Sequence, residues 1–107
     1  MSKDYGQDIA PMYDNQIAID YSQSIFEEMA FASSKFPAFA SEHEGYAILL
    51  EEVDELWEAV KLNQKNPDRA KRIEKECIQV GAMALRFLHD MRMRRDKPTQ
   101  SDEVVER

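Results

Sequence analysis

The sequence predicts an all-α protein of three main helices, two of which form an antiparallel pair. The 107-residue chain has only three glycines and four prolines, too few for a sandwich or a repeat array. Apolar residues make up 43% of the chain, enough for one modest core. Three long segments carry apolar side chains at spacings of three and four residues, the period of an amphipathic helix. We predict an N-terminal tail over residues 1–12, a helical domain over 13–95 and a flexible C-terminal tail over 96–107.

The first helix is expected to run from about Asp14 to Ser33. The segment SSKFPAF should end it, because Pro37 disfavours helical geometry at the residue before it. The apolar side chains of this helix recur at helical spacing: Ala18, Tyr21, Ile25, Met29 and Ala32.

The second helix is expected to begin at Ser41. Ser41 and Glu44 have the spacing of a capping box, in which each side chain satisfies a free backbone N–H at the start of a helix. The helix fades in LNQKN, residues 62–66. Its apolar stripe consists of Tyr46, Leu49, Leu50, Val53, Leu56, Trp57 and Val60.

The third helix is expected to start with Asn66 as its N-cap and Pro67 at its first position, and to end near Arg95. Its apolar residues are close to a heptad seam: Ala70, Ile73, Cys77, Val80, Ala84, Phe87 and Met91. Cys77 is the only cysteine and lies in this seam, so we expect a buried thiol and a reducing compartment.

The second and third helices are joined by a short connection, so they should pair antiparallel. Three helices of this length carry more apolar stripe than one copy can cover. We therefore expect the remaining seam to close against another copy, completing a four-helix bundle in a homodimer or homotetramer.

The net charge of −7, from 21 acidic and 14 basic residues, disfavours binding to a nucleic-acid polymer. No apolar run approaches the roughly 18–20 residues that a membrane span needs. The first ten residues, MSKDYGQDIA, lack the hydrophobic core of a signal peptide. We therefore expect a cytoplasmic protein that binds neither a nucleic-acid polymer nor a membrane.

Acidic residues gather on the second helix in EEVDE, residues 51–55. Glu51, Glu52 and Glu55 share one flank, since they are three or four residues apart. A charge run of this kind is usually a solvated face. The sequence of the third helix points to a second interpretation.

Glu76 falls within the apolar arc of the third helix. An ionised carboxylate in such a seam costs several kcal/mol unless a cation accompanies it. Gln79 lies one turn further on, and antiparallel pairing can bring Glu52 and Glu55 opposite these two residues. Oxygen donors from two helices suit Mg²⁺ or Mn²⁺. The alternative is a buried ion pair, with one of three arginines as the counter-charge: Arg69, Arg72 or Arg86.

EEVDE, followed by ECIQ at residues 76–79, resembles the E-E-x-x-E … E-x-x-D signature of the MazG-like, all-α nucleoside triphosphate pyrophosphohydrolases. The resemblance covers residues 43–90 and is strongest to small bacterial and phage members. It implies Mg²⁺-dependent cleavage of a (deoxy)nucleoside triphosphate, such as the purine deoxynucleotide dGTP, to a monophosphate and pyrophosphate. It also implies assembly into dimers or tetramers.

Carried over by position, the resemblance implies that Glu52, Glu55 and Glu76 are metal ligands. Gln79 would be a fourth ligand and stands where the family has aspartate, so the site loses one negative charge. Glu51 would support a second metal or the attacking water. Either Glu51 or Glu52 could accept the proton of that water, and the sequence does not choose between them.

A triphosphate also needs positive charge around its phosphates and an apolar slot for its base. We expect the substrate-binding residues to come from this list: Lys35, Phe36, Phe39, Lys61 and Arg86. The rival prediction is a non-enzymatic helical dimerisation or adaptor module, whose acids form a solvated stripe and whose Glu76 pairs with an arginine.

Overall fold

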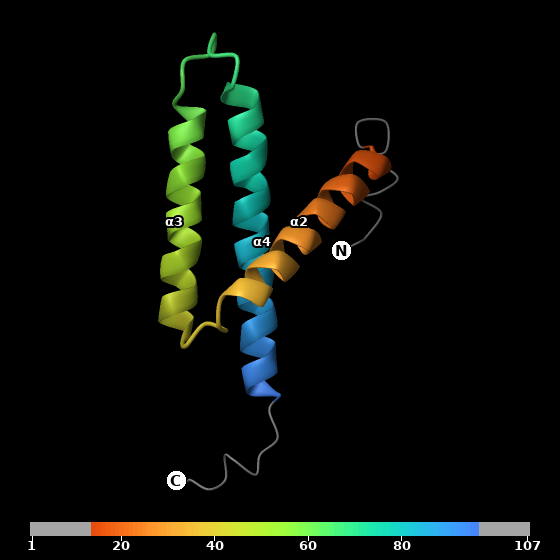
Figure 1. The fold of residues 1–107 in the computed structure, drawn as a ribbon, viewed down its shortest axis with the longest axis vertical. Coiled ribbons are helices and arrows are strands. Elements are labelled where there is room, and N and C mark those ends of the chain that lie inside the picture. The colour runs from red at the N-terminus through yellow and green to blue at the C-terminus, as the bar shows by residue number, and fades with distance from the viewer. Residues whose placement is uncertain (1–13, 97–107) are drawn as a thin grey trace, which may run out of the picture.

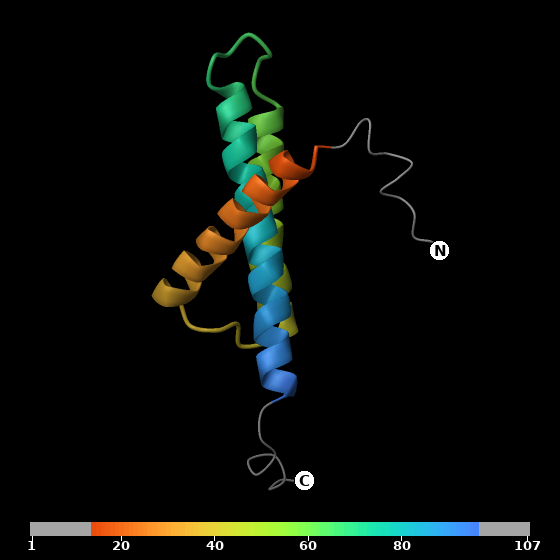
Figure 2. The ribbon, with the colours of Figure 1, turned by 90° about the vertical axis from the view of Figure 1, so that its right-hand side faces the viewer.

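The structure is a computed structural model that describes residues 14–96. It contains three helices in this range, α2 (Asn15–Lys35), α3 (Glu42–Val60) and α4 (Arg69–Arg95), and no strand. The all-α prediction is confirmed. The predicted tails lie outside the described residues, apart from Asp96. Figures 1 and 2 show α3 and α4 as an antiparallel pair, with α2 crossing α4 obliquely. α4 is the central element, since it contacts both other helices.

α2 begins and ends where local chemistry requires. The carboxylate of Asp14 caps the helix by accepting a hydrogen bond from the backbone N–H of Ile17 at 3.1 Å. The helix continues to Lys35, two residues beyond the predicted end, and Phe36 then adopts an extended conformation. The break therefore comes at the residue before Pro37, as the steric effect of proline requires.

α3 begins at the predicted capping residue. The hydroxyl of Ser41 accepts a hydrogen bond from the backbone N–H of Glu44 at 3.0 Å. The carboxylate of Glu44 accepts a hydrogen bond in return, from the backbone N–H of Ala40 and not from that of Ser41. The capping box is thus confirmed in its principal bond, with the reciprocal bond shifted by one residue.

The predicted start of the third helix is wrong. The side-chain oxygen of Asn66 accepts a hydrogen bond from the backbone N–H of Asp68 at 2.8 Å, and its carbonyl accepts one from Arg69 at 3.2 Å. These bonds form a turn that precedes the helix, so Pro67 lies in the turn. α4 starts at Arg69 and ends at Arg95, which confirms the predicted C-terminus.

The core is small and lies where the end of α2, the following loop, α3 and α4 meet. Gly45 allows α3 to approach α4 closely, because a Cβ atom there would lie 2.7 Å from the ring of Phe87. Gly81 has the same role between α4 and Ile25 of α2. The core cluster consists of four buried residues: Ala32, Phe39, Ala82 and Met83. Partly buried residues pack against it: Met29, Ile48, Leu49 and Phe87.

The buried strip of α4 differs from the predicted apolar seam. Its buried residues include three charged ones, as the list Glu76, Ala82, Met83, Arg86 and Asp90 shows. Cys77 is exposed, so the prediction of a buried thiol is wrong. Because α4 packs against two helices, the strip between those contacts is buried whatever its polarity, and positions outside it stay exposed.

An apolar face of α3 remains uncovered in the described part of the chain. Tyr46, Leu50, Val53 and Trp57 are between 41% and 61% exposed, although all four belong to the predicted apolar stripe. We call these four residues the exposed face of α3. Their spacings of four, three and four residues are those of a helix-pairing seam.

Candidate metal site and adjoining cavity

Three carboxylates converge between α3 and α4. One side-chain oxygen each from Glu52, Glu55 and Glu76 lies within 4.8 Å of the others. Glu76 is only 6% exposed, Glu52 is half-buried and Glu55 is exposed. We call these three residues the acid cluster. Antiparallel pairing brings them together, because Glu52 and Glu55 share one flank of α3 and face the buried side of α4.

No basic side chain neutralises the acid cluster within residues 14–96. The ion pairs of this range involve other carboxylates, those of Glu42, Glu58, Asp90 and Asp96. Arg69 instead donates two hydrogen bonds to the carbonyl of Val60, at 3.2 and 3.0 Å. The alternative of a buried ion pair at Glu76 is therefore wrong for the described part of the chain.

The crowding of acids affects Glu52. Burial raises the pKa of its carboxyl above the usual value, and the negative charges of four other glutamates raise the pKa further. Those charges are, in decreasing order, on Glu55, Glu76, Glu51 and Glu28. The ionised form of Glu52 is therefore less favourable than that of a free glutamate, and a cation in the acid cluster would offset this cost.

A cavity of about 410 Å³ adjoins the acid cluster. Its apolar wall comes from all three helices and the α2–α3 loop and includes Phe31, Phe36, Phe39, Ile48 and Met83. Its polar lining includes Glu28, Glu44, Glu51, Glu52, Gln79 and Arg86. The cavity thus combines an apolar slot with an acidic end.

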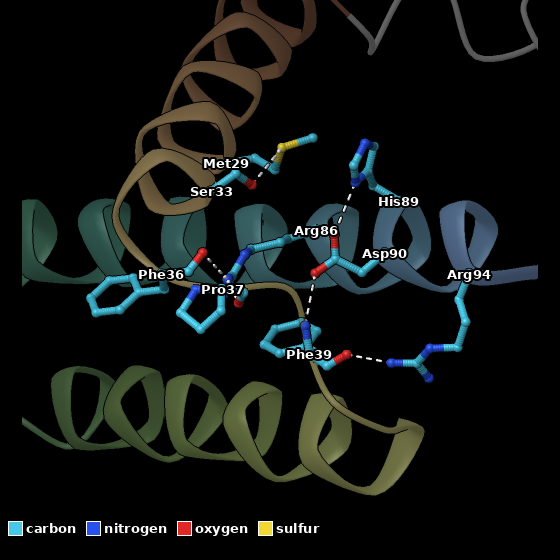
Figure 3. Close-up of polar contacts among 9 residues, drawn as sticks. All are labelled: Met29, Ser33, Phe36, Pro37, Phe39, Arg86, His89, Asp90 and Arg94. Atoms are coloured by element: carbon cyan, nitrogen blue, oxygen red, sulfur yellow. Dashed lines mark hydrogen bonds and ion pairs between the residues drawn. The ribbon is translucent and has the colours of Figure 1, made fainter. Parts of the chain in front are cut away.

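Hydrogen bonds from α4 fix the loop that closes this cavity (Figure 3). Arg86 donates from Nη2 to the carbonyls of Phe36 and Pro37, at 3.2 and 2.6 Å. The carboxylate of Asp90 accepts from the backbone N–H of Phe39 at 3.1 Å. Arg94 donates to the carbonyl of Phe39. These three side chains are spaced by four residues, so one face of α4 holds the whole loop.

Most of the residues predicted for the site lie at the cavity or in the acid cluster. Those lining the cavity are Phe36, Phe39, Glu51, Glu52, Gln79 and Arg86. The two predicted lysines lie elsewhere: Lys35 packs 5.2 Å from the ring centroid of Phe31, and Lys61 pairs with Glu58 at 3.1 Å. Neither lysine lines the cavity.

Sequence reasoning missed Glu28 on α2, which lines the cavity and whose negative charge acts on Glu52. A signal for it exists. Glu28 lies three residues after Ile25 and four before Ala32, so it falls in the apolar stripe of its helix, as Glu76 does.

A second hollow of about 530 Å³ lies between α2 and α4 and shares Glu28 and Gln79 with the cavity. Two lysines line it, Lys71 and Lys75. Within residues 14–96 neither forms an ion pair with a carboxylate. The sequence did not single out these lysines. Three glutamates, Glu27, Glu28 and Glu74, line the same hollow, so the lysines offset only part of its negative charge.

Comparisons with protein-family models, with curated proteins and with solved structures find no match for this chain. The resemblance to the MazG-like family stays a prediction from the quoted residues. Across residues 14–96, none of the helices has the length and apolar character needed to cross a membrane.

Proposed function

We propose that this chain is a metal-dependent nucleoside triphosphate pyrophosphohydrolase. It would cleave a (deoxy)nucleoside triphosphate, such as the purine deoxynucleotide dGTP, to a monophosphate and pyrophosphate. One observation carries the proposal: three carboxylates within 4.8 Å of one another, one of them nearly buried, with no basic side chain paired to them in residues 14–96. Such an arrangement is electrostatically unfavourable without a cation.

The donor atoms fit Mg²⁺ or Mn²⁺. The acid cluster supplies carboxylate oxygens, and Gln79 on the next turn after Glu76 adds an amide oxygen. Hard oxygen donors of this kind favour these ions over metals that prefer sulfur or imidazole. When bound, the ion would offset the negative charge of the triphosphate and make a water molecule more acidic.

The residues of the chain account for the remaining requirements. In the proposed reaction the oxygen of water bonds to the α-phosphorus, the bond from that phosphorus to the bridging oxygen breaks, and pyrophosphate leaves. Glu51 or Glu52, both at the acidic end of the cavity, accepts the proton of the water. The apolar wall holds the base, and Lys71 and Lys75 attract the outer phosphates from the neighbouring hollow.

The exposed face of α3 supports the proposal of a homodimer or homotetramer. A second copy seated on this face would bury four large side chains and place two α3–α4 pairs together as a four-helix bundle. The spacings of four, three and four residues suit that packing.

The test is an assay of pyrophosphate and monophosphate release from the four dNTPs, with Mg²⁺ or with EDTA. We expect release that depends on Mg²⁺ and that Glu76→Gln reduces by at least about a hundredfold, since a metal ligand is lost. Glu58→Gln is the matched control, because Glu58 is exposed on α3 and pairs with Lys61 outside the acid cluster. Absence of release from every dNTP with Mg²⁺ or Mn²⁺ would overturn the proposal.

The exposed face of α3 also favours a second candidate, a non-enzymatic dimerisation or adaptor module. Such a module would use the same apolar face but would release no pyrophosphate. The hydrolysis assay therefore separates the two candidates, whereas a measurement of oligomeric state alone does not.

A further inference from the structure

We propose that Arg86 recognises a carbonyl oxygen on the base of the bound nucleotide, so that the cavity prefers 6-oxopurines, such as guanine and hypoxanthine, to adenine. The inference rests on the proposed function for the identification of the ligand as a nucleotide and for the placement of its phosphates at the acid cluster. The role differs from that expected from the sequence, in which Arg86 is a candidate to bind phosphate.

The position of Arg86 along α4 separates it from the phosphates. Glu76, Gln79, Met83 and Arg86 follow one another at spacings of three, four and three residues, so they lie on one face of the helix. Arg86 is ten residues from Glu76, about 15 Å along the helix axis. If the phosphates are held at the acid cluster, the base extends towards the Arg86 end of the cavity.

Arg86 has hydrogen-bonding capacity that the described chain leaves unused. Its side chain is 4% exposed and its guanidinium carbon lies 4.5 Å from the ring centroid of Phe39. Nη2 makes both hydrogen bonds to the loop carbonyls, and the buried Nε has no acceptor within residues 14–96. In the same range no carboxylate pairs with the guanidinium. Nε has almost no accessible surface, so a ligand in the cavity would instead meet Nη1, which forms no hydrogen bond within the described residues.

The chemistry of the guanidinium determines which base fits. Arginine is only a donor, so it pairs with the O6 carbonyl of guanine or hypoxanthine and opposes the 6-amino group of adenine. The flat ring of either base would lie against the apolar wall, between the side chains of Phe36 and Met83. Discrimination by a buried donor of this type is expected to be about tenfold or more.

The experiment measures binding of dGMP, dIMP and dAMP to the full chain by calorimetry in the presence of Mg²⁺. These monophosphates are products, so binding is observed without turnover. dIMP shares O6 with dGMP but lacks its 2-amino group. The comparison of dIMP with dAMP therefore tests the effect of the group at position 6 without any contribution from a 2-amino group. We expect dGMP and dIMP to bind about tenfold more tightly than dAMP. Equal binding of dIMP and dAMP would overturn the inference.

Arg86→Gln tests the residue itself. We expect the variant to bind dIMP as weakly as dAMP, with affinity for dAMP changed by less than about threefold. Arg94→Gln is the matched control, because Arg94 also holds the loop but does not line the cavity. If Arg86→Gln lowers the affinity for all three nucleotides by the same factor, Arg86 has a phosphate-binding or purely structural role, and the inference is overturned. The same loss of preference in Arg94→Gln would do so as well.

The two proposals can fail separately. Tighter binding of dIMP than dAMP without any pyrophosphate release overturns the proposed hydrolase and leaves the role of Arg86 intact. Pyrophosphate release with equal kcat/KM for dITP and dATP overturns the role of Arg86 and leaves the hydrolase intact. If Arg86→Gln does not fold, the comparison of dIMP with dAMP in the unaltered chain still decides.

Discussion

The carboxylate of Asp90 accepts a hydrogen bond from the backbone N–H of Phe39 at 3.1 Å, between residues 51 positions apart in the sequence. Asp90 is 8% exposed, and its other oxygen lies 2.9 Å from Nδ1 of His89. Phe39 belongs to the small core. The hydrogen bond from Phe39 to Asp90 therefore fixes the backbone of the α2–α3 loop. It also holds the ring of Phe39 in the core.

We expect Asp90→Ala to lower the free energy of unfolding by about 1–3 kcal/mol, because the buried N–H of Phe39 loses its acceptor. Urea unfolding followed by circular dichroism measures the change. Asp96→Ala is the control and should leave the midpoint almost unchanged, since Asp96 is exposed and its ion pairs within residues 14–96 are with the neighbouring Arg92 and Arg95. Equal midpoints for Asp90→Ala and the unaltered chain would show that the bond contributes no stability.

Glu76→Gln should raise the melting temperature in EDTA, because it removes one negative charge from the acid cluster. The unaltered chain should also gain stability when Mg²⁺ is added, whereas the variant should gain little. Thermal melts with and without Mg²⁺ provide both values, with Glu58→Gln as the control. A lower melting temperature for Glu76→Gln in EDTA would mean that Glu76 has a favourable partner without metal.

The raised pKa of Glu52 predicts how stability depends on pH. The folded chain binds the proton of Glu52 more tightly than the unfolded chain, so this group destabilises the fold as pH rises from about 4.5 through its folded pKa. In EDTA we expect Glu52→Gln to show a smaller loss of stability between pH 4.5 and 7 than the unaltered chain. Urea midpoints across a pH series test this. Parallel curves for the two proteins would contradict the prediction.

Gly45→Ala should destabilise the α3–α4 pair by about 1–3 kcal/mol, because the new methyl group would lie 2.7 Å from the ring of Phe87. Gly81→Ala is the matched control. Its methyl group would meet the flexible end of Ile25, at 2.8 Å, so a small shift can relieve the contact. Both variants gain the same helix propensity. Unfolding midpoints should therefore rank Gly45→Ala below Gly81→Ala, and the reverse order would contradict the role given to Gly45.

Leu50→Glu should convert the proposed dimer or tetramer to a monomer, because it introduces a charge into the exposed face of α3. Analytical ultracentrifugation measures the oligomeric state. Leu88→Glu is the control, since Leu88 is 65% exposed on α4 and lies outside that face. A monomeric unaltered chain at high concentration would rule out the proposed assembly.

The end of α2, to within two residues, and the start of α3 could be predicted from the sequence because the interactions that set them are local. Ser41 and Glu44 are three residues apart, and Pro37 acts on the residue beside it. The start of α4 was predicted wrongly because Asn66 forms a turn with Asp68, and a short polar side chain can cap either a turn or a helix.

Helical periodicity also predicted that the three acids of the acid cluster lie close together. Glu52, Glu55 and Glu76 lie on helix faces that oppose each other in an antiparallel pair. The contacts of Arg86, by contrast, could not be read from its neighbours in the sequence. They depend on a loop 50 residues away that folds back over α4.

The sequence by itself determined the number of helices, most of their ends and the meeting of three acids, because each follows from spacings within a few turns or from a short connection. Only the tertiary structure decided that Cys77 is exposed, that Glu28 joins the cavity and that Arg86 and Asp90 are buried. The physical reason lies in α4, which is packed against two other helices. The strip of a helix that is buried depends on where its neighbours cross it, and those crossings arise from the packing of the whole chain.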